Sequence, residues 1–285
     1  MKGTVKLVEC PRDAMQGWPH FIPTEKKIAY LNALLRVGFH TLDFGSFVSP
    51  KAIPQMADTA AVFKGLDLTD SQTALLAIVA NTRGAEDACA FPEIQYLGYP
   101  FSVSETFQQR NTNASIADSL VTVRKIQELC VKHRKQLVVY LSMGFGNPYN
   151  DPFGPDILLQ WMNKLVTEGI EIMSVADTVG LATPDEVSHI MQAVMQAHPD
   201  REIGVHLHST AANRIDKLNA ALGAGVLRFD GAIKGIGGCP MAGDQLVGNM
   251  DTEVMIEHFN NVGYALPIDT SALQHAVRMS AEVFI

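Results

Sequence analysis

The chain has 285 residues, of which 47% are hydrophobic and 18% are charged, and this balance excludes a disordered protein and favours a well-packed globule. Its formal net charge of −8 argues against a general nucleic-acid binder, because phosphate contacts require a basic surface. No apolar run approaches the roughly 18 residues of a membrane-spanning helix, so we expect no membrane partner either.

Targeting and redox signals point to the cytoplasm. The first residues, MKGTVKLVEC, are not followed by a long apolar run, so we expect no signal peptide. The four cysteines are scattered without paired spacing, at Cys10, Cys89, Cys130 and Cys239. This pattern is typical of reduced thiols in a cytoplasmic protein, which is the location that we expect.

Strand-like and helix-like patterns alternate along the whole chain. The predicted strands cover residues 5–10, 40–47, 74–81, 93–102, 136–143, 171–177, the first part of 201–215, and 226–233. The predicted helices cover residues 24–38, 56–66, 83–91, 115–134, 154–169, 183–199, 214–225, 251–263 and 271–284. Ser115 is a suitable N-terminal cap, and Thr183 with Pro184 forms another helix-start signal.

Eight strand–helix pairs predict a (β/α)8 TIM barrel with one additional C-terminal helix. No linker divides the chain, so we expect a single catalytic domain over residues 1–285. A doubly wound open sheet is the alternative, but it usually has fewer strands and a phosphate-binding glycine loop after its first strand. The segment CPRDAMQG, which follows the first predicted strand, lacks that loop.

Two histidines, His206 and His208, lie one residue apart within the apolar segment IGVHLH. Side chains alternate between the two faces of a strand, so both imidazoles point the same way, with Cα atoms roughly 7 Å apart. Either histidine alone is explained by hydrogen bonds to neighbouring backbone. The pair favours a metal site, because imidazole is a common ligand for divalent metals.

In a TIM barrel the reactive side chains gather at the carboxyl ends of the strands. Ionisable residues stand at these positions here: Arg12 and Asp13 after the first strand, Asp43 in the second, Asp177 at the end of the sixth, and His206 and His208 at the end of the seventh. We therefore expect these six side chains to meet on one rim.

Asp13 and the two imidazoles form a mixed oxygen and nitrogen ligand set, which Asn249 would complete. An Asn at such a position is also a common turn residue, so both interpretations stay open. Carboxylate and amide oxygens favour Mg²⁺ or Mn²⁺, although Zn²⁺ or Co²⁺ also bind mixed sets. Arg12 beside a metal either binds an anion or pairs with the acids of the barrel, such as Asp43.

Cys239 follows the segment GIGG and precedes Pro240, after the eighth predicted strand. The glycines make this loop a plausible hinge, and a thiol on it can transfer a proton when its pKa is tuned. A small buried hydrophobic residue after a tight turn is the alternative interpretation.

These segments resemble the family of metal-dependent lyases and synthases that includes 3-hydroxy-3-methylglutaryl-CoA lyase. The likeness lies in CPRDAMQ, GSFVSPKAIPQMAD, ADTVG, HLHS and GIGGCPMAGDQLVGN, and it extends over nearly the whole chain. The resemblance implies metal ligation by Asp13, His206, His208 and Asn249. It also implies catalytic roles at Arg12 for enolate stabilisation, at Cys239 for proton transfer, and at the rim acids Asp43, where the family has Glu, and Asp177.

The reaction implied by the resemblance is a retro-Claisen cleavage of a 3-hydroxy-3-methylglutaryl-CoA-like thioester to acetyl-CoA and a keto acid, acetoacetate in the parent case. The expected partners are an acyl-CoA substrate and a second copy of the chain in a homodimer. Alternatives are a Claisen-condensing acyltransferase of the same superfamily, a related keto-acid aldolase, and a non-catalytic barrel that binds acyl-CoA or metal.

Overall fold

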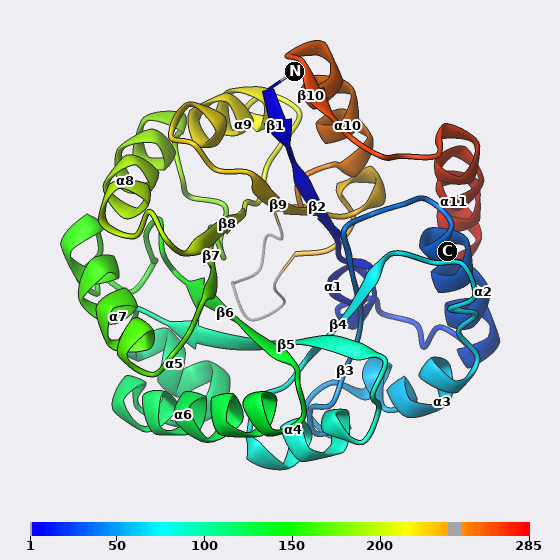
Figure 1. Cartoon of the computed structure of the whole chain (residues 1–285), viewed down its shortest axis with the longest axis horizontal. Coiled ribbons are helices and arrows are strands. Elements are labelled where there is room, and N and C mark those ends of the chain that lie inside the picture. Colours follow the sequence, from blue (N-terminus) through cyan, green and yellow to red (C-terminus); the bar gives the residue numbers. More distant parts are fainter. Residues whose placement is uncertain (1, 239–246) are drawn as a thin grey trace.

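Eight parallel strands close into a barrel in the computed structural model, which describes residues 2–238 and 247–285. Each strand pairs with its neighbour in chain order, and the last pairs with the first, which closes the ring (Figure 1). The strands are β2 Lys6–Glu9, β3 Thr41–Ser46, β4 Ala74–Ile78, β5 Ile94–Ser102, β6 Gln136–Ser142, β7 Ile172–Ala176, β8 Glu202–His206 and β9 Arg228–Gly231. The predicted (β/α)8 barrel is confirmed.

Helices surround this barrel on its outer side (Figure 1). They are α2 Thr24–Leu35, α3 Thr59–Lys64, α4 Thr82–Cys89, α6 Ile116–Lys132, α7 Pro155–Thr167, α8 Pro184–Ala197, α9 Arg214–Gly223, α10 Thr252–Asn261 and α11 Thr270–Val283. Both expected cap signals are confirmed, since Ser115 and Thr183 each accept a hydrogen bond from a backbone N–H of the first turn in a capping box.

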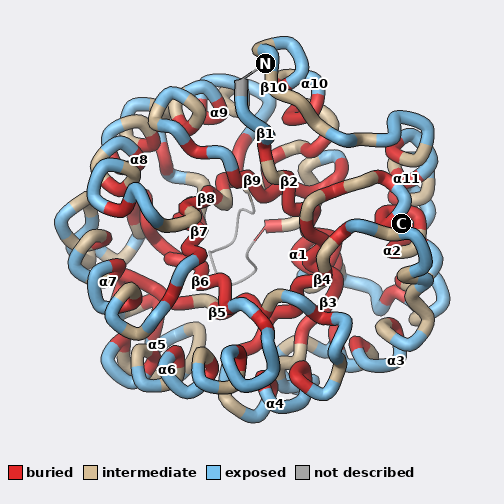
Figure 2. The backbone as a smooth tube through the Cα atoms, in the orientation of Figure 1, coloured by how far each residue is buried: buried red, intermediate tan, exposed pale blue. Residues whose placement is uncertain are grey.

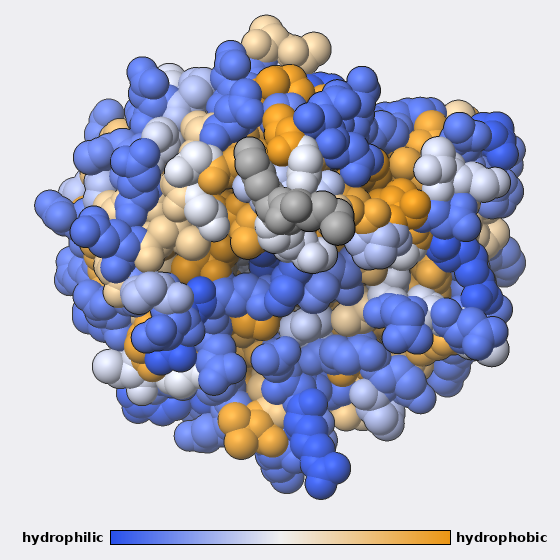
Figure 3. Space-filling model, turned by 45° about the horizontal axis from the view of Figure 1, so that its top comes forward, coloured by the Kyte–Doolittle hydropathy of each residue, from blue (hydrophilic) through white to orange (hydrophobic). Residues whose placement is uncertain are grey.

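The barrel strands are buried on both faces, as expected when helices cover a parallel sheet. All residues of β3 and β7 are buried, and Figure 2 shows buried segments at the centre with exposed residues on the outer sides of the helices. The face in Figure 3 is mostly hydrophilic, with apolar side chains in separate small groups. None of the described helices is both long and apolar enough to cross a membrane.

Several short elements were not expected from the sequence. Helix α1 (Pro11–Gln16) follows β2 directly, and helix α5 (Glu105–Thr112) follows β5. Strand β1 (Lys2–Thr4) pairs with β10 (Tyr264–Ala265) outside the barrel, and two 3-10 turns lie at Pro54–Met56 and Ile233–Gly235. These elements are too short or too polar to show a clear apolar period, so their formation depends on tertiary contacts that the sequence pattern does not reveal.

Glu9 ties the first barrel strand to the segments that follow the last one. Its Oε1 accepts a hydrogen bond from the Ile233 N–H at 2.9 Å, and its Oε2 accepts one from the Thr252 hydroxyl at 2.6 Å. Burial raises the pKa of Glu9 from an ordinary 4.5 to about 8. The folded protein therefore favours the neutral carboxyl. This contribution to stability is fully present below the ordinary pKa of 4.5, and it is lost as the pH rises towards 8.

We expect Glu9→Gln to raise the free energy of unfolding above that of the wild type at about pH 8, and to leave it nearly unchanged at about pH 5. The amide stays neutral and can still accept from Ile233 while it donates to Thr252. Urea unfolding of both proteins across this pH range measures the difference. A difference that does not grow with pH would contradict the assignment.

Candidate metal-binding site

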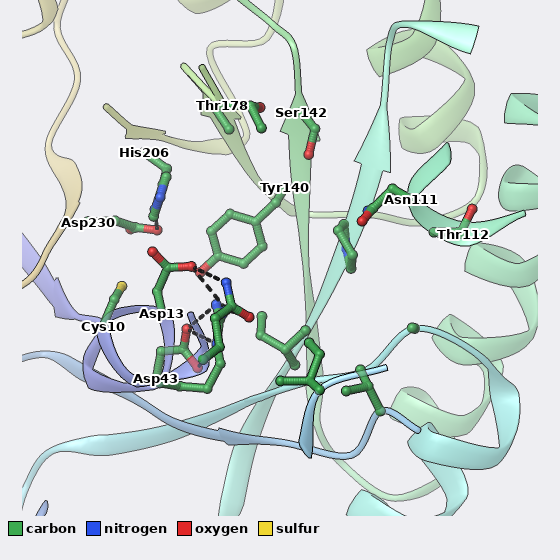
Figure 4. A pocket seen from close by; sticks show the side chains of 18 of the residues that line it. Cys10, Asp13, Asp43, Asn111, Thr112, Tyr140, Ser142, Thr178, His206 and Asp230 are labelled. Atoms are coloured by element: carbon green, nitrogen blue, oxygen red, sulfur yellow. Dashed lines mark hydrogen bonds and ion pairs between the residues drawn. The ribbon is translucent and has the colours of Figure 1, made fainter. Parts of the chain in front are cut away.

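A cavity of about 440 Å³ opens at the carboxyl ends of the barrel strands (Figure 4). Its lining includes Ser142, Ala176 and His206, which are the last residues of β6, β7 and β8. Polar groups and apolar side chains both contribute to the wall, so the cavity can hold a charged head and an apolar stem of one ligand.

Asp13, His206 and His208 meet in this cavity, as the strand-end positions predict. One ligand atom from each of the three lies within 4.8 Å of the others. Asp13 comes from α1, His206 ends β8, and His208 lies just beyond it in an isolated bridge with Asn249. The two imidazole centroids are 5.3 Å apart, so both rings reach the same space.

Asn249 joins this group through its amide rather than acting as a turn residue. Its Nδ2 donates to Asp13 Oδ2 at 2.8 Å and to the Ile236 carbonyl at 2.9 Å. Its Oδ1 is buried and has no hydrogen-bond partner among the described residues. A buried acceptor without a donor is costly, and a bound cation would satisfy it.

The charge states also suit a cation. Burial opposes ionisation of Asp13, but the charge of Arg12, together with His206 and the hydrogen bond from Asn249, outweighs it and holds the pKa of Asp13 below its usual value. Burial lowers the pKa of His208 to about 3, so its imidazole is neutral at physiological pH. Metal ligands must be deprotonated, and the Asp13 carboxylate with the His208 imidazole meets that condition. Burial lowers the pKa of His206, but the hydrogen bond and charge of Asp230 outweigh it and raise that pKa, so a bound cation would compete with a proton there. The residues present therefore fit a divalent metal ion.

Arg12 lies beside this group and is held on two sides. Its guanidinium donates to Asp43 through Nε at 3.0 Å and Nη2 at 2.6 Å, and to Asp13 through Nη1 at 3.1 Å. Burial raises the pKa of Asp43 to about 6, although Arg12 opposes the shift. The structure thus contains the expected pairing of Arg12 with barrel acids, and Arg12 also lines the cavity.

Asp177 does not join the cavity lining. Its carboxylate accepts a hydrogen bond from Lys217 Nζ at 2.7 Å and one from the Ala182 N–H at 3.1 Å. The same Lys217 Nζ donates to the His208 carbonyl at 2.8 Å. Asp177 therefore supports the backbone of His208 through Lys217, and it does not line the cavity.

Cys239, the expected proton-transfer residue, lies outside the described residues. Sequence analysis did not single out Asp230 or Tyr140, which both line the cavity. Asp230 Oδ2 lies 3.2 Å from His206 Nδ1. Asp230 lies within the eighth predicted strand, residues 226–233, as Asp43 lies within the second, and this position was the available signal.

Comparisons with known proteins agree with this geometry. The model of the HMGL-like family matches residues 5–279. The hydroxymethylglutaryl-CoA lyase YngG of Bacillus subtilis is 34% identical over 263 residues, which are 90% of this chain and 84% of that protein.

Solved structures give the same result. The HMG-CoA lyase from Brucella melitensis superposes with a TM-score of 0.91 at 29% identity and covers 98% of both chains. An HMG-CoA lyase from Acinetobacter baumannii, in complex with coenzyme A and 3-methylmalate, has a TM-score of 0.90 at 30% identity and covers 99% of this chain and 91% of that one. The resemblance found in the motifs is confirmed, and the chain belongs to the HMGL-like family.

Proposed function

We propose that this protein is a carbon–carbon lyase that cleaves a 3-hydroxy-3-methylglutaryl-CoA-like thioester to acetyl-CoA and acetoacetate. The observation that carries the proposal is the convergence of Asp13, His206 and His208 beside Arg12 in one cavity at the carboxyl end of the barrel. The lyase names of the relatives and the coenzyme A bound to one of them support the same substrate class.

Asp13, His206, His208 and the amide oxygen of Asn249 would hold the cation, for which we propose Mg²⁺ or Mn²⁺. When bound, such an ion supplies Lewis acidity, which makes loss of a proton from a bound hydroxyl easier. The oxygen atoms of the set favour these hard ions, whereas a set of thiolates would favour softer ones.

Cleavage of the thioester requires three balanced changes. The substrate hydroxyl gives up a proton as it becomes a carbonyl, the electrons of the C–C bond move to the thioester as an enolate, and the enolate takes up a proton at carbon. One proton is lost and one is gained, so the reaction as a whole is balanced in protons. Arg12, held by Asp43 and Asp13, would stabilise the negative charge of the enolate. We assign the final proton transfer to Cys239, on the basis of the loop motif.

Metal dependence distinguishes the lyase from a non-catalytic barrel. We expect acetyl-CoA release from a 3-hydroxy-3-methylglutaryl thioester to stop after chelation and to return with Mn²⁺ or Mg²⁺. Claisen condensation of acetyl-CoA with a 2-oxo acid, or cleavage of a free keto acid, would instead favour the two enzyme alternatives. Mass spectrometry of the products with each substrate separates the four cases.

Two variants test the division of roles in the site. We expect His208→Ala to lose both metal affinity and turnover, because it removes a ligand. Cys239→Ser should lower turnover far more than metal affinity, because a proton-transfer group does not hold the ion. Calorimetric Mn²⁺ titration and turnover measured on both variants give the comparison, and equal loss of metal binding in the two would contradict it.

Arg12→Lys tests enolate stabilisation, since it keeps the charge and removes the planar fork. We expect turnover to fall by about 10²–10³-fold, as when one donor to a developing oxyanion is removed, with little change in Mn²⁺ affinity. Arg36→Lys makes the same substitution at an exposed arginine paired with Asp67, and it should leave turnover unchanged. Turnover of Arg12→Lys near that of the control would refute the role.

We assign Asp177 a positioning role within the proposed reaction. Its ion pair with Lys217 supports the His208 backbone, so Asp177→Asn should weaken Mn²⁺ binding and turnover together. A direct catalytic role would lower turnover alone. Parallel Mn²⁺ titration and kinetics decide between the two.

The proposal also includes a cytoplasmic homodimer that acts on an acyl-CoA. The reduced state expected in the cytoplasm is consistent with Cys10, Cys89 and Cys130, which are free and buried. Sedimentation at micromolar concentration measures the oligomeric state, and a single monomeric species would remove the dimer from the proposal.

A further inference from the structure

Asp230 is a buried carboxyl group that neither the motifs nor the reaction above explains. It lies on β9, is 2% exposed, and its Oδ2 is 3.2 Å from Nδ1 of His206. Figure 4 shows Asp230 and Asp13 both close to the His206 ring. Since Nδ1 faces Asp230, the second ring nitrogen, Nε2, is left for another partner.

We propose that Asp230 is a positioning residue that fixes the orientation and tautomer of His206, with the proton on Nδ1 and the lone pair of Nε2 available to the cation. The inference rests on the proposed metal-binding function. Carboxylates that accept a hydrogen bond from a ligating histidine are a general means of orienting the ring and raising its basicity as a ligand.

The His206 ring is also restrained by its neighbours. The Tyr140 ring meets it edge-on, with centroids 6.1 Å apart and planes at 88°, and the His208 ring lies 5.3 Å away. These contacts limit how the imidazole can tilt, and they leave the identity of the protonated nitrogen open. The hydrogen bond to Asp230 supplies that remaining constraint.

Arg228 precedes Asp230 by two residues on β9. Residues two apart on a strand point to the same face, so both side chains enter the barrel interior. Arg228 donates to Glu202 through Nη1 at 2.9 Å, while its Nε and Nη2, and Oδ1 of Asp230, are buried with no partner among the described residues. The positive charge of Arg228 interacts with Asp230 and helps to compensate the charge of this buried carboxylate.

A competing interpretation makes Asp230 itself a metal ligand. Ligand atoms of Cys10, His206 and Asp230 also lie within 4.8 Å of one another. Two observations favour the positioning role: Cys10 Sγ donates to the Val8 carbonyl at 3.7 Å, and Asn249, whose amide oxygen has no partner among the described residues, is hydrogen-bonded to Asp13. The two interpretations differ in what they require of Cys10.

The test is calorimetric titration of Mn²⁺ into the wild type and Asp230→Asn. An amide can turn its NH2 group to Nδ1 and favour the wrong tautomer, so we expect about 10–100-fold weaker binding. Ser174→Ala, a matched change at another buried polar group inside the barrel, should bind Mn²⁺ like the wild type. Cys10→Ser should also bind normally.

Mn²⁺ binding by Asp230→Asn within about twofold of the wild type would overturn the inference, because loss of a carboxylate that orients a ligating histidine normally lowers metal affinity by more than this. An equally large loss in Cys10→Ser would also overturn it, because Asp230 would then be a ligand. Absence of Mn²⁺ binding in the wild type would also overturn the inference. Metal titration is independent of turnover, so a protein that binds Mn²⁺ but releases no acetyl-CoA would refute only the proposed reaction.

The tautomer of His206 can also be measured in the wild type, so this result does not depend on how Asp230→Asn folds. Imidazole ¹⁵N NMR of the metal-free protein, recorded at a pH above which the His206 signals no longer shift, should show a proton on Nδ1 and a free Nε2. His206→Gln assigns the resonance by its disappearance. A proton on Nε2 would overturn the inference.

Discussion

The hydrogen bond from Asn249 to Asp13 joins residues that are 236 positions apart, and the rest of the site depends on it. Asp13 lies just after the first barrel strand and Asn249 lies beyond the last, so they meet because β9 pairs with β2 and closes the ring. The bond uses the amide nitrogen, and the buried amide oxygen has no partner in the part of the chain that the structure describes. Barrel closure therefore also brings the candidate metal ligands together.

Burial of so many polar groups in one cavity is stable only when their charges are matched. Arg12 lies between Asp13 and Asp43 and balances both carboxylates, and the buried Lys217 balances Asp177 behind His208. Removing one member of such a pair leaves an uncompensated buried charge, which is strongly destabilising. The same pairs hold the candidate ligands and Arg12 in place before any substrate arrives, and such preorganisation would reduce the reorganisation required during the reaction.

The sequence predicts the barrel well because eight apolar strands and amphipathic helices repeat along the chain, and strand ends identify Asp13, His206 and His208. It cannot show which way a residue at the end of a strand turns. Ala176 lines the cavity, and Asp177, one residue later, points to Lys217 instead. Nor does the sequence show that Arg228 and Asp230, two residues apart on β9, both point into the barrel. Helix α5 escaped detection because its polar sequence has no apolar period and its start depends on contacts from the distant Asp151.

The central claim is that one cation is bound by side chains from both ends of the chain. Anomalous diffraction from crystals grown with Mn²⁺ tests it most directly. The account predicts a single peak bonded to Asp13, His206, His208 and the amide oxygen of Asn249, next to the guanidinium of Arg12. A Mn²⁺ peak at a different place, or imidazoles that turn away from Asp13 when Mn²⁺ is present, would contradict it.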